Sequence, residues 1–159
     1  MKNKAGWFWR MVATGFGCGY SPIAPGTTGS IGALIPAIIL LYTSSNAYLW
    51  LGLMIVVLGI LGAVAANMLE IEWGHDASRI VIDEVVGMWI SLMWIGKGWI
   101  AIVTAFILFR FFDAVKPAGI ARFESLPGGI GVMADDVVAG IATNLLIQVG
   151  LFLLTMFGE

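Results

Sequence analysis

Two apolar segments, at residues 47–67 and 137–157, are long enough to cross the hydrocarbon core of a bilayer, which takes about 20 residues of helix. Hydrophobic residues make up 60% of the 159 residues and charged residues only 11%, so most of the chain cannot face water. Lipid is therefore the solvent for most of the side chains. The sequence predicts an all-α membrane protein.

Three shorter apolar segments, at residues 29–42, 80–95 and 99–112, carry polar residues at their ends. Such segments fit helices that place one end in a polar pocket or lie in a locally thinned bilayer. Together with the two long segments they predict a compact bundle of about five transmembrane helices. The breaks between the segments are short, so we expect one membrane-embedded domain over residues 1–159.

The basic residues fix the expected orientation of this bundle. With the amino terminus inside, seven of the eight Lys and Arg residues lie at or near the inner face, and Lys97 alone lies at the outer face. The positive-inside rule then predicts a multi-pass protein with a cytoplasmic amino terminus. All the acidic residues except Glu159 lie at this same face. The net charge of −2 shows no basic patch for nucleic acid.

Three of the predicted helices bring carboxylates to the cytoplasmic face. Asp83 and Glu84 lie near the inner end of the third segment, and Asp83, Gly87 and Ser91 share one helix face because they are spaced by four residues. A carboxylate at membrane depth turns away from lipid. We therefore expect this face to point into the bundle.

The fourth and fifth segments add further charges. Arg110, Asp113 and Lys116 follow one another at three-residue spacing, which lets neighbours pair across a helix turn. Asp135 and Asp136 precede the last apolar segment, and Asp136 begins a second four-residue series that includes Gly140, Asn144 and Gln148. Two structural alternatives stay open: Arg110 and Asp113 as an intramembrane ion pair, and Asp135 and Asp136 as helix amino-terminal residues favoured by the macrodipole.

These carboxylates suit a hard divalent cation, since Mg²⁺ binds one or two carboxylates and keeps water and phosphate oxygens as its other ligands. The four or five carboxylates at this face suffice for one or two ions. Zinc is less favoured, because the chain has one cysteine, Cys18, and one histidine. Basic side chains beside the acids indicate an anionic substrate, and the combination is typical of phosphoryl chemistry. His75 and Asp76 are second-tier candidates in a loop.

Glycine recurs between two prolines and several hydroxyl residues in the segment 15–30. Such a backbone is not a regular helix, and irregular chain at membrane depth lines a cavity or is buried in protein. We therefore expect a re-entrant or cavity-lining loop. Its last part, residues 26–30, could offer backbone N–H groups and hydroxyls to a phosphate at the start of the first span.

Four segments, at residues 15–30, 82–89, 109–117 and 129–140, together resemble the phosphatidylglycerophosphatase A family in order and spacing. The family comprises bacterial inner-membrane enzymes that remove the terminal phosphate from phosphatidylglycerophosphate and require Mg²⁺. The resemblance implies this activity, this location and this cofactor for the chain, with a phospholipid substrate and no nucleic acid. Cys18 departs from the small residue expected at its position.

The resemblance also implies roles for individual residues. The carboxylates expected to be catalytic are Asp83, Glu84, Asp113 and Asp136, and the residues expected to bind the substrate phosphate are Arg110, Lys116, Ser21, Thr27 and Ser30. The mechanistic hypothesis is in-line attack by an activated water on phosphorus, with one or two Mg²⁺ held by the expected metal ligands Asp83, Glu84, Asp135 and Asp136. Asp113 either acts as the base or orients Arg110, and a covalent aspartyl-phosphate stays open.

A membrane transporter with an acidic cation site at the cytoplasmic face is the alternative from another functional class. Intramembrane acids and broken helices are also typical of transporters. Against this alternative, the charges lie at one face, and the sequence shows neither an inverted repeat nor a carboxylate at the midplane.

Overall fold

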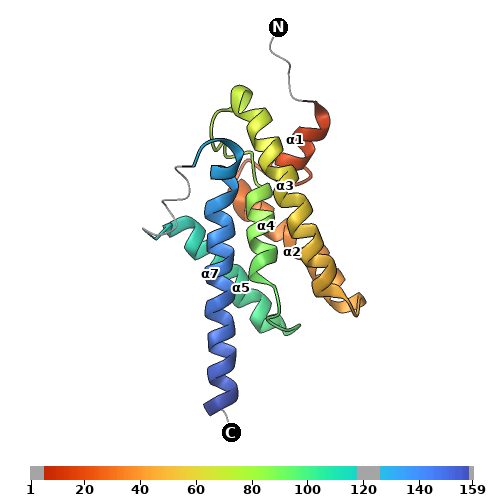
Figure 1. Cartoon of the computed structure of the whole chain (residues 1–159), viewed down its shortest axis with the longest axis vertical. Helices are drawn as coiled ribbons and strands as arrows, with labels where there is room; N and C mark the ends of the chain where they lie inside the picture. The colour runs from red at the N-terminus through yellow and green to blue at the C-terminus, as the bar shows by residue number, and fades with distance from the viewer. Residues whose placement is uncertain (1–5, 118–125, 158–159) are drawn as a thin grey trace.

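The computed structural model of the chain describes residues 6–117 and 126–157, and all regular structure within these ranges is helical (Figure 1). The elements are α1 (Trp7–Ala13), the 3₁₀ helix η1 (Cys18–Tyr20), α2 (Pro25–Thr43), α3 (Ala47–Trp73), α4 (Ile82–Ser91), α5 (Trp99–Val115) and α7 (Gly128–Phe157). The predicted all-α class is confirmed. Arg122 and Glu124, two charged residues expected in a loop, lie outside the described residues.

Three of the described helices, α2, α3 and α7, are long and apolar enough to cross a membrane. α2 begins at Pro25, earlier than the expected first span, because proline fits the first position of a helix, where its missing N–H is not needed. α5 has 17 residues and α4 only 10. The count of about five transmembrane helices therefore stays a prediction.

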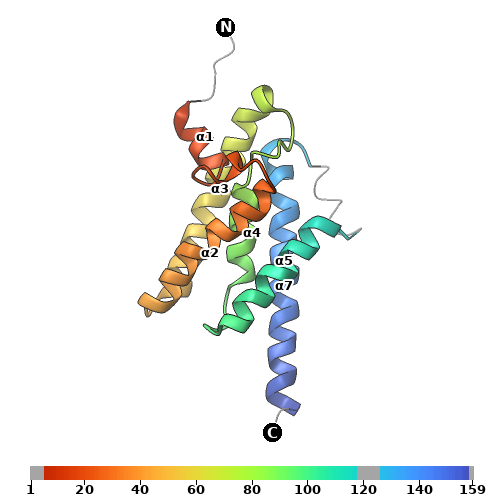
Figure 2. The same cartoon turned by 180° about the vertical axis from the view of Figure 1, so that it is seen from behind.

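The short helix α4 lies at the centre of the bundle. It packs against α2, α3, α5 and α7, and the views from the front and from behind both place it between these helices (Figures 1 and 2). Eight of its ten residues are buried, including Asp83, Gly87 and Ser91. The predicted inward face of this segment is therefore confirmed. α4 is apolar because other helices surround it on all sides.

Glycine lets α4 and α7 touch backbone to backbone. A Cβ atom added at Gly87 would lie 2.6 Å from the carbonyl oxygen of Asp136, and one added at Gly140 would lie 2.5 Å from the carbonyl oxygen of Gly87. Real Cβ atoms do not approach this closely, so both positions require glycine. Small residues at such contacts are the usual means by which helices pack closely in membranes.

The carboxyl end of α4 lies inside the bundle, where its last carbonyl groups need hydrogen-bond donors. The Asn144 side-chain amide donates to the carbonyl oxygens of Ser91, at 3.3 Å, and Met93, at 2.6 Å. Gln148 donates to the Asn144 side-chain oxygen at 2.7 Å. The polar series on α7 thus faces inward, and its carboxyl-terminal part, Asn144 and Gln148, caps α4.

The glycine-rich segment departs from the expectation in its second half. Residues 14–24 form turns and η1, with positive φ at Gly15, Phe16, Gly17 and Ala24, whereas the chain from Pro25 onward is regular helix. The expected irregular backbone over all of 15–30 is therefore wrong for residues 25–30.

Candidate active site

Two carboxylates at the start of α4 meet one from α7. Asp83, Glu84 and Asp136 each offer an oxygen atom, and these oxygens all lie within 4.8 Å of one another. We call these three residues the acidic cluster. Asp83 is 6% exposed and Asp136 3% exposed, so the cluster lies inside the protein, where carboxylates occur only with compensating partners.

The start of α4 is held in place by buried apolar residues and one backbone hydrogen bond. Val81 and Ile82 are fully buried, and the Val81 N–H donates to the Ala13 carbonyl oxygen at 2.9 Å. Asp83 and Glu84 follow in the first turn of the helix, where negative side chains are favoured by the helix dipole. The Asp83 carboxylate also accepts the Glu84 N–H at 3.0 Å.

Two carboxylate oxygens in the cluster are buried without a hydrogen-bond partner within the described part of the chain, Glu84 Oε2 and Asp136 Oδ1. Buried carboxylate oxygens in folded proteins almost always have a partner. A divalent cation coordinated by both oxygens would provide one. All the ligand atoms are carboxylate oxygens, which is the donor set that Mg²⁺ and Mn²⁺ prefer, so the cluster fits the expected metal.

A basic side chain from α5 lies beside the acidic cluster. Arg110 Nη1 is 2.6 Å from Asp113 Oδ2 and 3.5 Å from the Ser30 hydroxyl oxygen on α2. A Cβ atom added at Gly26 would overlap the Glu84 carboxylate and lie 3.3 Å from Arg110 Nη1. The first turn of α2 is therefore in direct contact with Glu84 and Arg110. Asp113 in turn interacts electrostatically with both Glu84 and Asp136.

Asp135 does not belong to the acidic cluster, although it was expected among the metal ligands; its carboxylate accepts the Asp136 N–H at 3.0 Å. Its Oδ2 is 2.7 Å from Lys116 Nζ, just after the end of α5. Neighbouring residues on a helix point about 100° apart, so the short side chains of Asp135 and Asp136 face different partners. The ligand role of Asp135 stays a prediction, and so does direct phosphate binding by Lys116.

The helix that carries these aspartates begins at Gly128, about two turns before Asp135. Asp135 and Asp136 are therefore not helix amino-terminal residues, and that alternative is wrong. α7 can begin this early because the Gly129 N–H donates to the Asn67 side-chain oxygen at 2.8 Å. This hydrogen bond fixes the first turn of α7 against α3.

The three hydroxyl residues expected at the phosphate differ in their positions. Ser30 is buried, donates to the Gly26 carbonyl oxygen at 3.0 Å and contacts Arg110. Thr27 lies half-buried in the first turn of α2. The Ser21 hydroxyl donates to the Ile23 carbonyl oxygen at 2.8 Å within its own loop.

The second-tier candidates lie in the connection between α3 and α4. His75 is exposed and its Nδ1 is 2.7 Å from Glu70 Oε1, and Asp76 is exposed with a φ of 49°. Neither belongs to the acidic cluster. Gly26 was expected only as part of the phosphate-binding segment 26–30, and its close approach to Glu84 and Arg110 was not predicted. Its place between proline and two threonines was the one signal for that contact, since a glycine there permits a close approach.

Comparison with known proteins identifies the family. The family model described as Phosphatidylglycerophosphatase A matches residues 11–151. The chain is 38% identical over 137 residues to phosphatidylglycerophosphatase A of Escherichia coli K12, covering 84% of this chain and 77% of the relative. It is 40% identical over 139 residues to the Haemophilus influenzae protein of the same name, covering 82% of this chain and 81% of the relative.

A third relative carries a different name. A protein of Bacteroides thetaiotaomicron, named as a proposed phosphatidylinositol-3-phosphatase, is 45% identical over 144 residues, covering 87% of this chain and 91% of the relative. No solved structure matches the chain. Because the family model spans most of the sequence and two relatives bear the family's name, the chain belongs to the phosphatidylglycerophosphatase A family.

Proposed function

We propose that the chain hydrolyses the terminal phosphomonoester of phosphatidylglycerophosphate, which yields phosphatidylglycerol and phosphate for phospholipid biosynthesis, at the cytoplasmic face of a bacterial inner membrane. The observation that carries the proposal is a buried group of three carboxylates in contact with an arginine and a helix amino terminus. Acids that suit a metal and a base that suits a phosphate are the requirements of phosphoryl chemistry.

Asp83, Glu84 and Asp136 would hold the proposed Mg²⁺. When bound, this ion supplies positive charge to the phosphate oxygens and activates water. The protein contributes a dry surrounding, because α4 and α7 bury both aspartates. Electrostatic interactions are stronger in such a site than in water.

Arg110 is the proposed contact for the substrate phosphate. Its planar guanidinium can donate two parallel hydrogen bonds to phosphate oxygens. Asp113 and Ser30 hold this side chain beside the acidic cluster. The first turn of α2, at Gly26 and Thr27, adds backbone N–H groups that favour an anion at a helix amino terminus.

Asp113 has two possible tasks in this arrangement. It is paired with Arg110 and also interacts with Asp136, so it can orient the arginine or accept a proton from the attacking water. Lys116 is held by Asp135 at the edge of the site, where it adds positive charge near the phosphate. A phosphorylated carboxylate trapped during turnover would show that the reaction passes through a covalent aspartyl-phosphate and not through direct attack of water on phosphorus.

The test is phosphate release by the purified chain in detergent micelles, with Mg²⁺ and then with excess chelator. The substrates are phosphatidylglycerophosphate, phosphatidic acid and phosphatidylinositol 3-phosphate, the last because one relative bears that name. We expect metal-dependent release with preference for the glycerophosphate head group. Phosphate release from the inositol lipid alone would show that the substrate is phosphatidylinositol 3-phosphate and not phosphatidylglycerophosphate. No release from any of the three lipids by folded protein would contradict the proposal and favour the transporter alternative.

A further inference from the structure

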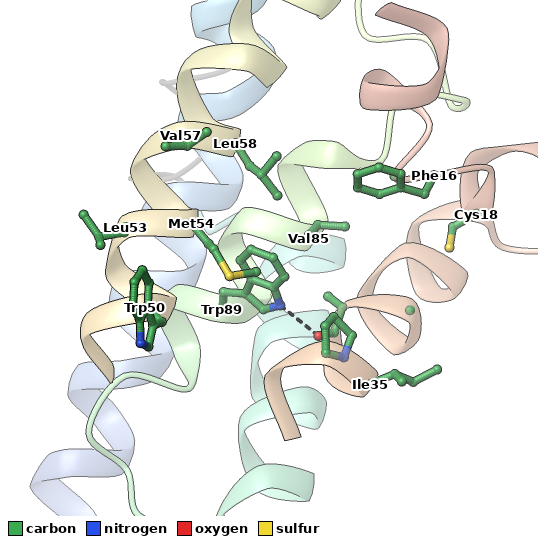
Figure 3. A pocket seen from close by; sticks show the side chains of 14 residues that line it. Phe16, Cys18, Ile35, Trp50, Leu53, Met54, Val57, Leu58, Val85 and Trp89 are labelled. Carbon is green, nitrogen blue, oxygen red and sulfur yellow. Dashed lines mark hydrogen bonds between the residues drawn. The ribbon is translucent and has the colours of Figure 1, made fainter. Parts of the chain in front are cut away.

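A groove with a volume of about 760 Å³ lies between α2 and α3, with α4 as its floor (Figure 3). Leu58 and Met54 line it from α3, Gly32 and Pro36 from α2, and Trp89 from α4. Every side chain that lines it is apolar or, at Cys18, a thiol. We call it the α2–α3 groove.

One end of the α2–α3 groove lies at the turn of α4 that carries Asp83 and Glu84. Val85, which lines the groove, follows Glu84 directly in α4. Figure 3 shows Val85 and Phe16 toward this end and Trp50 toward the other. Between Leu58 and Trp50 the groove follows eight residues of α3, which is about 12 Å of helix. The groove therefore begins at the turn of α4 that carries two residues of the acidic cluster and runs along the bundle.

Small residues and one hydrogen bond shape the groove. α2 presents Gly32, Ala33 and Pro36 to the groove, and Ile35, which also lines it, is 62% exposed, so the large side chain of this helix fills little of the space. The Trp89 indole donates to the Ala33 carbonyl oxygen at 2.8 Å, which satisfies the buried N–H and fixes the ring in the floor (Figure 3).

We propose that the α2–α3 groove binds an acyl chain of the phospholipid whose phosphate lies at the acidic cluster, an inference that rests on the proposed function. A chain attached to a bound head group is held near the groove at high effective concentration. Once there, it gains packing contacts with protein on three sides. The named relatives differ in head group but share the phosphatidyl part, so a site for that part suits all of them.

Two other apolar grooves suit this role less well. One of about 520 Å³ lies between α5 and α7 and is smaller than the α2–α3 groove; it reaches Leu108, two residues before Arg110, but on α7 it begins only at Leu146, ten residues beyond Asp136. The other, of about 410 Å³, lies between α3 and α7 and includes Ile130 and Met133. It borders the site but is roughly half the size of the α2–α3 groove.

The kinetic test uses the full-length chain with a substitution that fills the groove. Leu58→Trp places an indole in the groove, whereas the matched control Ile60→Trp lies on the same helix at a position that is 63% exposed and outside the groove. With dipalmitoyl phosphatidylglycerophosphate in mixed micelles, we expect Leu58→Trp to raise KM about tenfold, equivalent to about 1.4 kcal/mol, and Ile60→Trp to leave KM unchanged. With the dihexanoyl substrate, Leu58→Trp should have little effect.

The failures of the two proposals are distinguishable. No phosphate release by the unsubstituted chain would overturn the proposed function and this inference with it. Release with the same KM for Leu58→Trp and Ile60→Trp would overturn the inference alone. So would a KM increase from Ile130→Trp without one from Leu58→Trp, because the chain would then lie between α3 and α7.

A second measurement needs no substitution in the groove, because the only cysteine of the sequence, Cys18, lines it. We expect its alkylation by N-phenylmaleimide to slow at least about fivefold during turnover of saturating dipalmitoyl substrate, and not during turnover of the dihexanoyl substrate. Equal alkylation rates would overturn the inference. Slow alkylation of Cys18 in the absence of lipid substrate would also overturn the inference if the protein has a dimeric mass in detergent. A second copy of the chain would then occupy the groove.

Discussion

Glu84 and Asp136 each keep one buried carboxylate oxygen without a hydrogen-bond partner in the described part of the chain. Burying a charge costs several kcal/mol unless an opposite charge lies close to it. Arg110, which is paired with Asp113 beside the acidic cluster, offsets part of this cost. The acidic cluster is therefore the place where metal binding and folding stability should be coupled.

Asp136→Asn should lower phosphate release by roughly two to three orders of magnitude, because it removes a charge on which the proposed site depends. Asp83→Asn should act in the same way. The matched control is Glu72→Gln, which alters an exposed ion pair with Arg10 and should leave activity unchanged. Near-normal activity of both aspartate variants would show that the acidic cluster is not the active site.

Metal binding can be measured separately from activity. At 100 times its dissociation constant, Mg²⁺ should stabilise the unsubstituted chain by about 2.7 kcal/mol, which is observed as a higher unfolding temperature in detergent. Asp136→Asn should lose most of this stabilisation, whereas Glu72→Gln should keep it. An equal increase in all three proteins would place the metal elsewhere.

Arg110→Lys should raise KM about tenfold although it keeps the charge, because lysine cannot offer two parallel N–H donors to a phosphate. Arg79→Lys is the matched control. Arg79 lies over the Trp73 ring, at 5.9 Å from its centroid, and should tolerate the change. Equal KM values for the two variants would contradict the proposed phosphate contact.

At the scale of single residues, four-residue spacing predicted which side chains face inward. Asp83, Gly87, Ser91 and Asn144 are buried as expected, because polar groups at membrane depth have few alternatives to the interior. The partner of Asp135 could not be predicted. Whether a carboxylate faces a cluster or a lysine depends on the rotation of α7, which the contacts with α3 and α4 fix.

At the scale of elements, the contact between α4 and α7 sets the geometry of the site. Gly140→Ala should destabilise the protein by roughly 1–3 kcal/mol, because the new Cβ would meet the Gly87 backbone, which cannot move aside. Gly150→Ala, in the same helix, should be neutral, since no neighbour lies within 4 Å of that Cβ. Thermal unfolding in detergent measures both variants. Equal unfolding temperatures would contradict the close packing of α4 on α7.

Helix ends were harder to predict than helix positions. The expected third segment continued to residue 95, but α4 ends at Ser91, because Asn144 binds the carbonyl groups that a longer helix would have bound itself. That donor lies on a helix 53 residues away in the sequence. Tertiary contacts of this kind leave no local signal in the segment whose end they determine.

At the scale of the whole molecule, charged residues gather toward one end. α1, the start of α4 and the end of α5 lie toward the amino-terminal end, and the connection between α4 and α5, which contains Lys97, lies toward the other (Figures 1 and 2). This arrangement agrees with the positive-inside orientation expected from the sequence, which stays a prediction. The polar side chains farther along α7, Asn144 and Gln148, are bound to carbonyl groups. They offer no support for a solute path.

The orientation can be tested with cysteines introduced into a Cys18→Ser background. Lys97→Cys should react with a membrane-impermeant maleimide in intact cells, because the α4–α5 connection is expected outside. Ser78→Cys, in the exposed α3–α4 connection, should react only after the cells are opened. The reverse pattern would place the acidic cluster near the opposite face.

The backbone contact between Gly87 and Gly140 also acts as a fixed spacer, since the two helices that carry the carboxylates cannot move closer and have no flexible side chains between them that could stretch. Mg²⁺ binds oxygens at 2.0–2.1 Å and Ca²⁺ at 2.3–2.6 Å with more ligands, so the two ions need openings of different width. Because the main chain limits how far apart the two aspartates of the acidic cluster can lie, the radius of the proposed ion should affect how well it binds. Calcium should therefore compete poorly at the acidic cluster, and a larger residue at either glycine should change which ion the enzyme accepts.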